Sequence, residues 1–378
     1  MALWLSAAFA SPANAVTLSL AVDAEGRRVA MAGLPSFWAE GRSEIRVFGR
    51  EGKKWVNAST ITSTPMHATI FVGRELLIEG RRHIERDGRW EPFGEPIVSA
   101  SRLISPMGEP NLHAAGSRVF VPGRFLEKSQ LWRLSEDGAA VESELDLPTG
   151  LFAGSRAVAT HEARIAILYA PIGEPCGLYV FERAASGWVR EGPVFPDVCG
   201  KDQDTAAVSL AIDEQRVAIG AYPNPNPDGR AGQVAVHERG DGGWPEVARV
   251  AYPDQGLGAP PEDHHPYLFG HRVELADGRL YVGAGYKMLL EYSPGGNSRS
   301  SFFYHGVMVF VPGEEGWLLE RHLVHTVPTA SFGSRFAARG SRVFVDSPDE
   351  AAVYVLRRSK TAYVEEARLP LAVDAEAN

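Results

Sequence analysis

One short pattern recurs seven times along the chain, at intervals of about fifty residues. Each copy is a strand-like run rich in β-branched residues, and the runs begin at Arg28, Glu75, Arg118, Arg164, Arg216, Arg279 and Arg342. The starts lie 47, 43, 46, 52, 63 and 63 residues apart, and helical periodicity is absent between them. A repeat of this kind predicts units that bury their faces on their neighbours, rather than one conventional core.

The repeating unit holds more than one strand. A second strand follows the first, for example at Gly177–Phe181 and Gly306–Phe310. A glycine-containing turn then leads to an aromatic residue, which is Trp55, Trp90, Trp188, Trp244, Trp317 or Tyr363. The third unit has the turn Asp137-Gly138 but no aromatic residue after it. Another apolar segment precedes each first-listed strand, so each unit has four antiparallel strands, as a propeller blade does.

The sequence therefore predicts an all-β fold, a seven-bladed β-propeller of four-stranded antiparallel blades. The expected blades are residues 16–63, 64–106, 107–150, 151–202, 203–262, 263–330 and 331–371, followed by a tail at 372–378. Six and eight blades are the alternatives, because the second unit is short and irregular. We expect the propeller to be monomeric.

The net charge and the N-terminal residues limit the partners and the cellular location that we expect. The formal net charge is −9, which disfavours a nucleic-acid partner because such a surface repels phosphates. No apolar run reaches the roughly 18 residues of a membrane span. Residues 1–15 combine an apolar stretch with Ala13-Asn14-Ala15, which predicts a signal peptide and an extracytoplasmic location. A disordered, alanine-rich leader is the alternative.

The combined motifs resemble a known repeat. Phe269–Val273, Leu280–Ala284, Gly306–Phe310 and Gly316-Trp317 together resemble the FG-GAP repeat of integrin α subunits and of exported bacterial proteins. The resemblance covers nearly the whole chain after residue 15, although blades two and three carry only its skeleton. It implies a seven-bladed propeller that binds a ligand.

Our main expectation is that the protein has no cofactor, although calcium is possible. A metal held by His264 or His265 together with His305 is a further possibility, for which solvated loop histidines are the alternative. Integrin-type repeats often bind calcium through Asp-x-Asp-x-Asp-Gly between their first two strands, where this chain has only short turns such as Ala24-Glu25-Gly26. Asn224, Asn226 and Asp228 offer alternating oxygen donors before Gly229, so they are the candidate calcium ligands. Ordinary turn chemistry explains the same run.

Long insertions fall at one face of the predicted ring. They are Leu34–Arg42, Glu91–Pro110, Tyr222–Ala231, Tyr252–Tyr267 and Gly285–His305, all in second-to-third strand loops or between blades. Long loops on a rigid scaffold usually carry binding. A protein or carbohydrate ligand is expected on residues that combine aromatic and polar groups. These candidates are Tyr222, Asp263, His264, His265, Tyr267, Tyr286, Lys287, Glu291, Tyr292, Tyr304 and His305.

Three arginines sit on the expected innermost strands. Arg156, Arg272 and Arg335 either line the channel mouth and attract an anionic ligand, or pair with a carboxylate or carbonyl of a neighbouring blade. The two cysteines, Cys176 and Cys199, flank one hairpin at its open end and are predicted to form a disulfide.

Three functions fit these observations. The first is an exported, non-catalytic binding module, and the second is a propeller enzyme acting as a hydrolase or lyase on a sugar, lactone or ester. The third is a structural repeat within a larger envelope assembly. The sequence contains no Gly-x-Ser-x-Gly, His-Glu-x-x-His or Cys-x-x-Cys motif. We therefore favour the binding module, and no catalytic residue is assigned.

Overall fold

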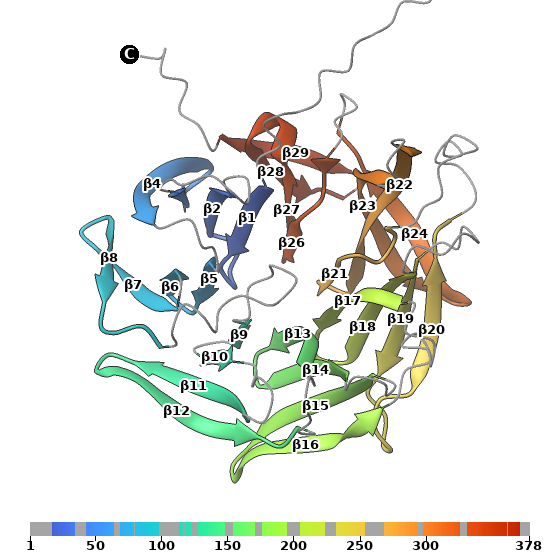
Figure 1. Cartoon of the computed structure of the whole chain (residues 1–378), viewed down its shortest axis with the longest axis horizontal. Coiled ribbons are helices and arrows are strands. Elements are labelled where there is room, and N and C mark those ends of the chain that lie inside the picture. The colour runs from blue at the N-terminus through green and yellow to red at the C-terminus, as the bar shows by residue number, and fades with distance from the viewer. Residues whose placement is uncertain are drawn as a thin grey trace, which may run out of the picture.

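The computed structural model describes residues 17–34, 43–63, 69–78, 80–97, 113–115, 118–121, 128–147, 154–170, 176–194, 205–223, 232–253, 268–292, 298–325, 331–360 and 362–370. They form seven antiparallel sheets of successive strands, arranged as a ring (Figure 1). This confirms the prediction of a seven-bladed β-propeller with four-stranded blades. Within these residues, no helix is long and apolar enough to cross a bilayer.

The strands of the first four blades have the following bounds. Blade one consists of β1 (Thr17–Val22), β2 (Arg28–Leu34), β3 (Ser43–Glu51) and β4 (Lys54–Ser63). Blade two consists of β5 (Thr69–Val72), β6 (Glu75–Ile78), β7 (Arg81–Arg86) and β8 (Arg89–Phe93). Blade three consists of β9 (His113–Ala115), β10 (Arg118–Val121), β11 (Ser129–Ser135) and β12 (Gly138–Leu145). Blade four consists of β13 (Gly154–His161), β14 (Arg164–Ala170), β15 (Gly177–Ala184) and β16 (Gly187–Val194).

The last three blades complete the ring. Blade five consists of β17 (Thr205–Ile212), β18 (Arg216–Pro223), β19 (Gln233–Glu238) and β20 (Glu246–Ala251). Blade six consists of β21 (Val273–Ala276), β22 (Arg279–Tyr292), β23 (Ser298–Gly313) and β24 (Gly316–Leu323). Blade seven consists of β26 (Phe336–Arg339), β27 (Arg342–Ser347), β28 (Ala352–Arg358) and β29 (Tyr363–Pro370), with the 3-10 helix η3 (Pro348–Glu350) between β27 and β28. The short strand β25 (Ser331–Phe332) pairs in parallel with β23.

Three predicted insertions begin later than the sequence suggested. Leu34 is the last residue of β2, Glu91–Phe93 belongs to β8, and Tyr222 and Pro223 are the last residues of β18. In the last two places the polar or proline-containing sequence still pairs in the ladder, Glu91 with Ile84 and Tyr222 with Ala206. Edge strands and strand ends tolerate such residues, so composition alone placed the boundary too early.

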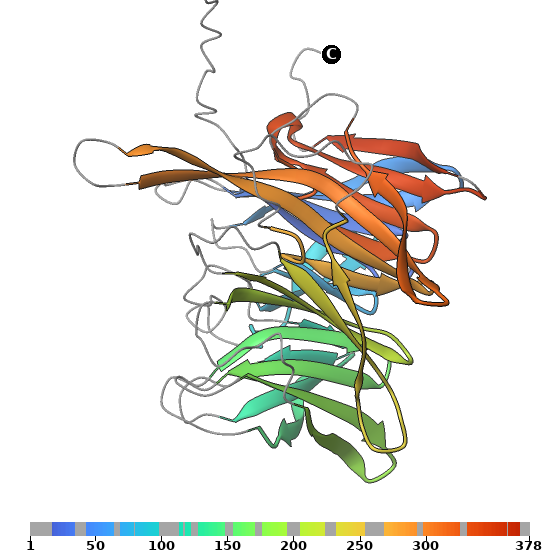
Figure 2. The ribbon, with the colours of Figure 1, turned by 90° about the vertical axis from the view of Figure 1, so that its right-hand side faces the viewer.

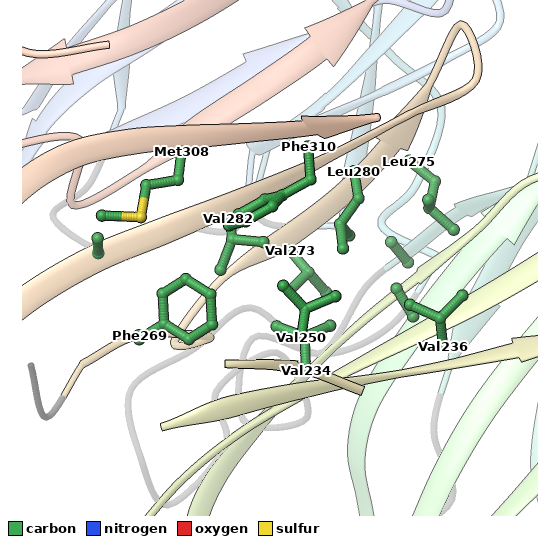
Figure 3. Close-up of a cluster of buried hydrophobic side chains, with 13 residues drawn as sticks. Val234, Val236, Val250, Phe269, Val273, Leu275, Leu280, Val282, Met308 and Phe310 are labelled. Carbon is green, nitrogen blue, oxygen red and sulfur yellow. The ribbon is translucent and has the colours of Figure 1, made fainter. Parts of the chain in front are cut away.

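The hydrophobic core lies between blades. Seven clusters of buried side chains occur, each formed by two adjacent blades. Alternate residues of one strand face opposite neighbours: Ile165 and Ile167 pack on blade three, whereas Ala166 and Leu168 pack on blade five. Figure 3 shows the cluster between blades five and six. The cluster between blades two and three has only five buried residues among those described.

The Phe-Gly pairs of blades six and seven have a steric role at these junctions. Phe269 is fully buried between blades five and six, and Gly270 has φ +82°. A Cβ on Gly270 would lie 2.9 Å from the carbonyl oxygen of Gln233 in the preceding blade. Gly333 has φ +85° and lies similarly close to Gly306. Glycine therefore permits both the backbone conformation and the close approach of the next blade.

The aromatic residue after each third-to-fourth strand turn contacts the preceding blade. The indole Nε1 of Trp244 donates to Glu191 Oε2 at 2.7 Å, and Trp55 Nε1 donates to Glu366 Oε1 at 3.3 Å. Trp90 packs under the guanidinium of Arg28, and Trp317 packs under that of Arg216, at 5.6 and 5.3 Å. In the remaining two cases Trp188 packs against the cluster between blades three and four, and the Tyr363 hydroxyl is 3.2 Å from that of Tyr281.

The described strands of the first and last blades stay within their own sheets. Blade seven has the order β26-β27-β28-β29 and blade one has the order β1-β2-β3-β4, so no strand within residues 17–63 pairs with one within 336–370. Among these residues, side-chain contacts hold the junction. Glu366 on β29 lies at its centre and contacts Arg50, Trp55, Arg342 and Arg357.

Candidate functional site

The alternation of strand directions fixes which connections share a face. Each blade begins at one face, so its second-to-third strand connection and its link to the next blade return to that face, which we call the connection face. The short turns at Ala24–Gly26, Asp87–Gly88, Asp277–Gly278 and Glu314–Glu315 lie at the other face. Four of the five predicted insertions lie mostly outside the described residues, although residues 94–97 and 252–253 are described, and the strand ends that flank these insertions lie at the connection face.

Blade six departs from the prediction at this face. The expected loop Gly285–His305 is a pair of extended strands, because β22 continues to Tyr292 and β23 starts at Ser298. The two strands pair in register from Gly285 with Tyr304 to Tyr292 with Ser298. We call residues 285–305 the arm, and Figure 2 shows it extending beyond the other blades. The apolar run at 288–290 and the aromatic run at 302–304 favour pairing over an irregular loop.

The arm holds six of the candidate ligand residues. Tyr286 pairs with Phe303 and Lys287 with Phe302, whereas Tyr292 pairs with Ser298. Glu291 lies at a register shift between Leu290 and Tyr292. Tyr304 and His305 also pair with Ser331 and Phe332 of β25, so they lie at the base of the arm. The structure thus brings these six positions into one hairpin.

Other candidates are placed apart or lie outside the described residues. Tyr222 lies near the end of β18. The residues Asp263, His264, His265, Tyr267, Asn224, Asn226, Asp228 and Cys199 fall outside the described ranges. Cys176 is buried just before β15, and its pairing with Cys199 stays a prediction. Among the described side chains, no three from His, Cys, Asp and Glu are close enough to hold a metal ion.

Of the three candidate arginines, Arg272 is the one whose side-chain contacts the structure describes most fully. Arg272 Nε donates to the carbonyl oxygen of Phe336 on the neighbouring blade at 2.7 Å, and its guanidinium lies over the Phe336 ring. Glu274 lies between Arg272 and Arg339, at 3.5 and 3.1 Å. Arg272 thus makes the interblade contact that one of the two interpretations required. Its side chain is still 38% exposed.

The structure describes fewer contacts for the other two candidate arginines, Arg335 and Arg156. The backbone N–H of Arg335 donates to Asp346 Oδ1 at 2.8 Å. Arg156 lies in β13, and its side chain is outside the described set. Binding of an anionic ligand by these three arginines stays a prediction.

Asp346 is a buried carboxyl group that the sequence reasoning did not select. It is fully buried on β27, where Ser334 Oγ donates to its Oδ2 at 2.6 Å. Burial raises its pKa to about 6, although the hydrogen bonds from Ser334 and Arg335 and the charges of Arg335 and Arg272 act in the opposite direction. The carboxyl group fixes the turn that leads into β26. An aspartate within the apolar run Arg342–Ser347, where two other blades have Gly220 and Gly283, was the available signal.

Blade six holds the equivalent turn by different means. His271 takes the place of Ser334, and its ring lies so close to Gly283 that a Cβ there would be 2.3 Å from the ring. The ring nitrogen Nδ1 is 2.8 Å from the carbonyl oxygen of Leu268. Burial lowers the pKa of His271 to about 4, so the ring is neutral at pH 7. The burial of Asp346 and of His271 is therefore explained by the turns that these two side chains hold in place.

Comparisons with known proteins show the fold alone. No protein-family model matches the sequence, and no curated protein matches it. Among solved structures, the chain is similar to a protein from Lactobacillus plantarum, with 11% identity over 93% of this chain and 84% of that one and a TM-score of 0.40. It is similar to the periplasmic gluconolactonase PpgL of Pseudomonas aeruginosa, with 11% identity, the same coverage and a TM-score of 0.38. It is also similar to Sqt1 of Chaetomium thermophilum, with 12% identity, coverage of 95% and 87%, and a TM-score of 0.49.

Proposed function

We propose that this β-propeller is an exported, non-catalytic binding protein that contacts a protein or carbohydrate ligand through its connection face, with the arm of blade six as the main contact element. The observation that carries the proposal is the length of β22 and β23, which pair well beyond the other blades (Figure 2). A two-stranded ribbon is only marginally stable by itself in water, so a protruding one is best explained by a partner that covers it.

The composition of the arm supports the same conclusion. Residues 285–305 include Tyr286, Tyr292, Phe302, Phe303 and Tyr304. Aromatic residues are enriched in binding interfaces because they bury a large area at a low cost in conformational entropy. The finer class also belongs to this proposal: an FG-GAP-type propeller, exported by residues 1–15 and containing a Cys176–Cys199 disulfide. The two Phe-Gly pairs, each at a blade junction, are the repeat feature that supports this class.

The test removes the arm and keeps the ring. Tyr286 and Phe303 pair directly, so replacing residues 287–302 by Asn-Gly closes the hairpin with a two-residue turn. The control replaces Glu314-Glu315 by Asn-Gly, at the opposite face of the same blade. Both variants and the parent chain are applied to a glycan array and to a panel of purified extracellular proteins.

We expect the parent and the control to bind the same ligand, and the arm-deleted variant to bind it at least tenfold more weakly. Equal binding by all three proteins would remove the arm from the function. Turnover of a sugar, lactone or ester substrate by the parent chain would contradict the non-catalytic part of the proposal.

A further inference from the structure

A cavity of about 330 Å³ lies between blades two and three, remote from the arm in the chain. Its walls include Arg82 and Phe93 of blade two and Trp132 of blade three. The turn residue Gly138 and the following Ala139 also line it. Such a volume is in the range of small-molecule sites.

The cavity occupies the place where the other blades have an aromatic ring. Gly138, Gly187, Gly243 and Gly316 hold the same turn position, with φ between +119° and +152°. The residue after the glycine is tryptophan in the last three cases and Ala139 in blade three. As described above, each of the six aromatic residues at this position contacts the preceding blade. Among the described residues, blade three therefore has Ala139 where six blades have an aromatic ring, and the cavity lies beside it.

The preceding blade also differs at this junction. Glu191, Glu320 and Glu366 each follow the aromatic residue of their blade by three positions, and the corresponding residue in blade two is Phe93. Glu191 and Glu366 accept the indole N–H of the next blade. With Phe93 in that position, the junction between blades two and three has an apolar ring where blades four and seven have a carboxylate.

Arg82 supplies an unused hydrogen-bond donor. Its side chain is 3% exposed, and its Nε and Nη2 donate to Glu75 at 2.6 and 2.7 Å. Nη2 also donates to the carbonyl oxygen of Ser135. Nη1 is buried without a hydrogen-bond partner among the described residues. A buried donor in this state is destabilising, so an oxygen atom that reached it would be favoured.

The charge around the cavity selects against anions. Glu75 already neutralises the guanidinium through two hydrogen bonds, so little net positive charge is left. Glu95 and Asp137, both exposed, also line the cavity. A ligand carboxylate would meet two like charges, whereas a neutral carbonyl oxygen would not.

We propose that this cavity is a binding site for a small, uncharged, planar aromatic compound that carries a carbonyl oxygen. The ring takes the place of the missing tryptophan against Phe93 and Trp132, and the oxygen accepts from Arg82 Nη1. The site is independent of the arm and of the proposed function.

Benzamide is the probe, with benzoate and toluene as its comparisons, and binding is measured by calorimetry and by chemical-shift changes. Benzamide is expected to bind at least tenfold more tightly than benzoate, which carries the repelled charge. Toluene lacks the oxygen atom and is expected to bind at least fivefold more weakly than benzamide. Absence of benzamide binding at 10 mM, or equal binding of benzoate, would overturn the proposal.

A pair of variants tests the position of the site without disturbing Arg82. Ala139→Trp supplies the ring that the other blades have, so it is expected to abolish benzamide binding and to raise the melting temperature by about 2–4 °C. Ala140→Trp places the same side chain on the exposed, opposite side of β12 and is expected to change neither property. Retention of benzamide binding by a folded Ala139→Trp variant would overturn the proposal, and so would a loss of binding in Ala140→Trp.

Discussion

The junction between blades one and seven should depend on one carboxylate, because the described strands of these blades form separate sheets. Glu366 is 9% exposed, and its oxygens lie 3.0 Å from Arg342 Nε and from Arg50 Nε. Trp55 Nε1 donates to it at 3.3 Å, and Arg357 lies at 3.7 Å. Replacing Glu366 by alanine removes the shared acceptor and leaves the arginines without compensation in a partly buried place.

The expected loss in free energy of unfolding follows from how exposed the arginine partners of Glu366 are. Breaking a fully buried ion pair by removing one partner costs about 3–5 kcal/mol. Arg342 and Arg50 are 15% and 25% exposed, so solvent screens part of the effect, and about 3 kcal/mol is expected for Glu366→Ala. Glu320→Ala is the matched control. Glu320 occupies the same blade position, but it is 30% exposed and pairs with Arg279 of its own blade, so about 1 kcal/mol is expected.

Equilibrium unfolding in urea, followed by tryptophan fluorescence and circular dichroism, measures both losses. A double-mutant cycle with Trp55→Phe isolates the interblade hydrogen bond, for which a coupling free energy of about 1 kcal/mol is expected. If Glu366→Ala cost no more than Glu320→Ala, the junction would be held by its apolar cluster alone, and our account of ring closure would be refuted.

Low pH should reduce the difference in free energy of unfolding between the parent chain and Glu366→Ala. Burial alone would raise the pKa of Glu366, but the hydrogen bond from Arg342 and the charges of Arg342 and Arg50 outweigh it and hold the pKa below its ordinary value. A carboxyl group whose pKa is lower in the folded state stabilises the fold above its unfolded pKa. That contribution is lost as the pH falls through the folded pKa, so the difference in free energy of unfolding should shrink at low pH.

Two further predictions concern the turns near the channel. Burial raises the pKa of Asp346 from 3.8 to about 6, so between these pH values the folded chain holds a proton that the unfolded chain releases. The parent chain should therefore lose stability relative to Asp346→Asn as the pH rises from 4 to 6. Unfolding titrations at several pH values should show a change of up to about 3 kcal/mol between the two proteins, and a constant difference would contradict the assignment. Gly270→Ala should cost about 1–2 kcal/mol more than Gly278→Ala in thermal or urea unfolding, because both glycines have positive φ but only Gly270 approaches the neighbouring backbone; equal losses would exclude a steric role.

The ring itself could be predicted from the sequence because every blade repeats the same local signals. Alternating apolar strands and glycine turns recur in all seven blades, the aromatic residue after the turn recurs in all but blade three, and each signal has a physical reason in the structure. Trp244, for instance, is buried at the junction between blades four and five, with its indole nitrogen bonded to Glu191. Repetition compensates for weak individual signals, since an irregular blade such as the second is placed by its neighbours.

The arm was misread as a loop for a related reason. Its residues have no counterpart in the other blades, so only its own composition was available, and polar residues such as Lys287 and Glu291 lowered the strand signal. Pairing across the hairpin, which stabilises the extension, depends on a register that one strand does not reveal. Asp346 was missed because its role depends on Ser334 in a different strand segment and on complete burial.

The two unusual junctions of the ring differ in a way that chain connectivity explains. Blades two and three are consecutive, so only residues 94–112 separate β8 from β9, and the two blades stay together even where Ala139 lines a cavity and only five buried residues form the described core. Blades one and seven are linked only through the whole ring, and bringing the ends of so long a segment together has a larger entropic cost. Their contacts must supply that free energy, which accounts for the cluster of Arg50, Arg342 and Trp55 on Glu366. A junction between consecutive blades can therefore give up an aromatic ring to a ligand site, whereas the closing junction cannot lose its carboxylate without weakening the ring.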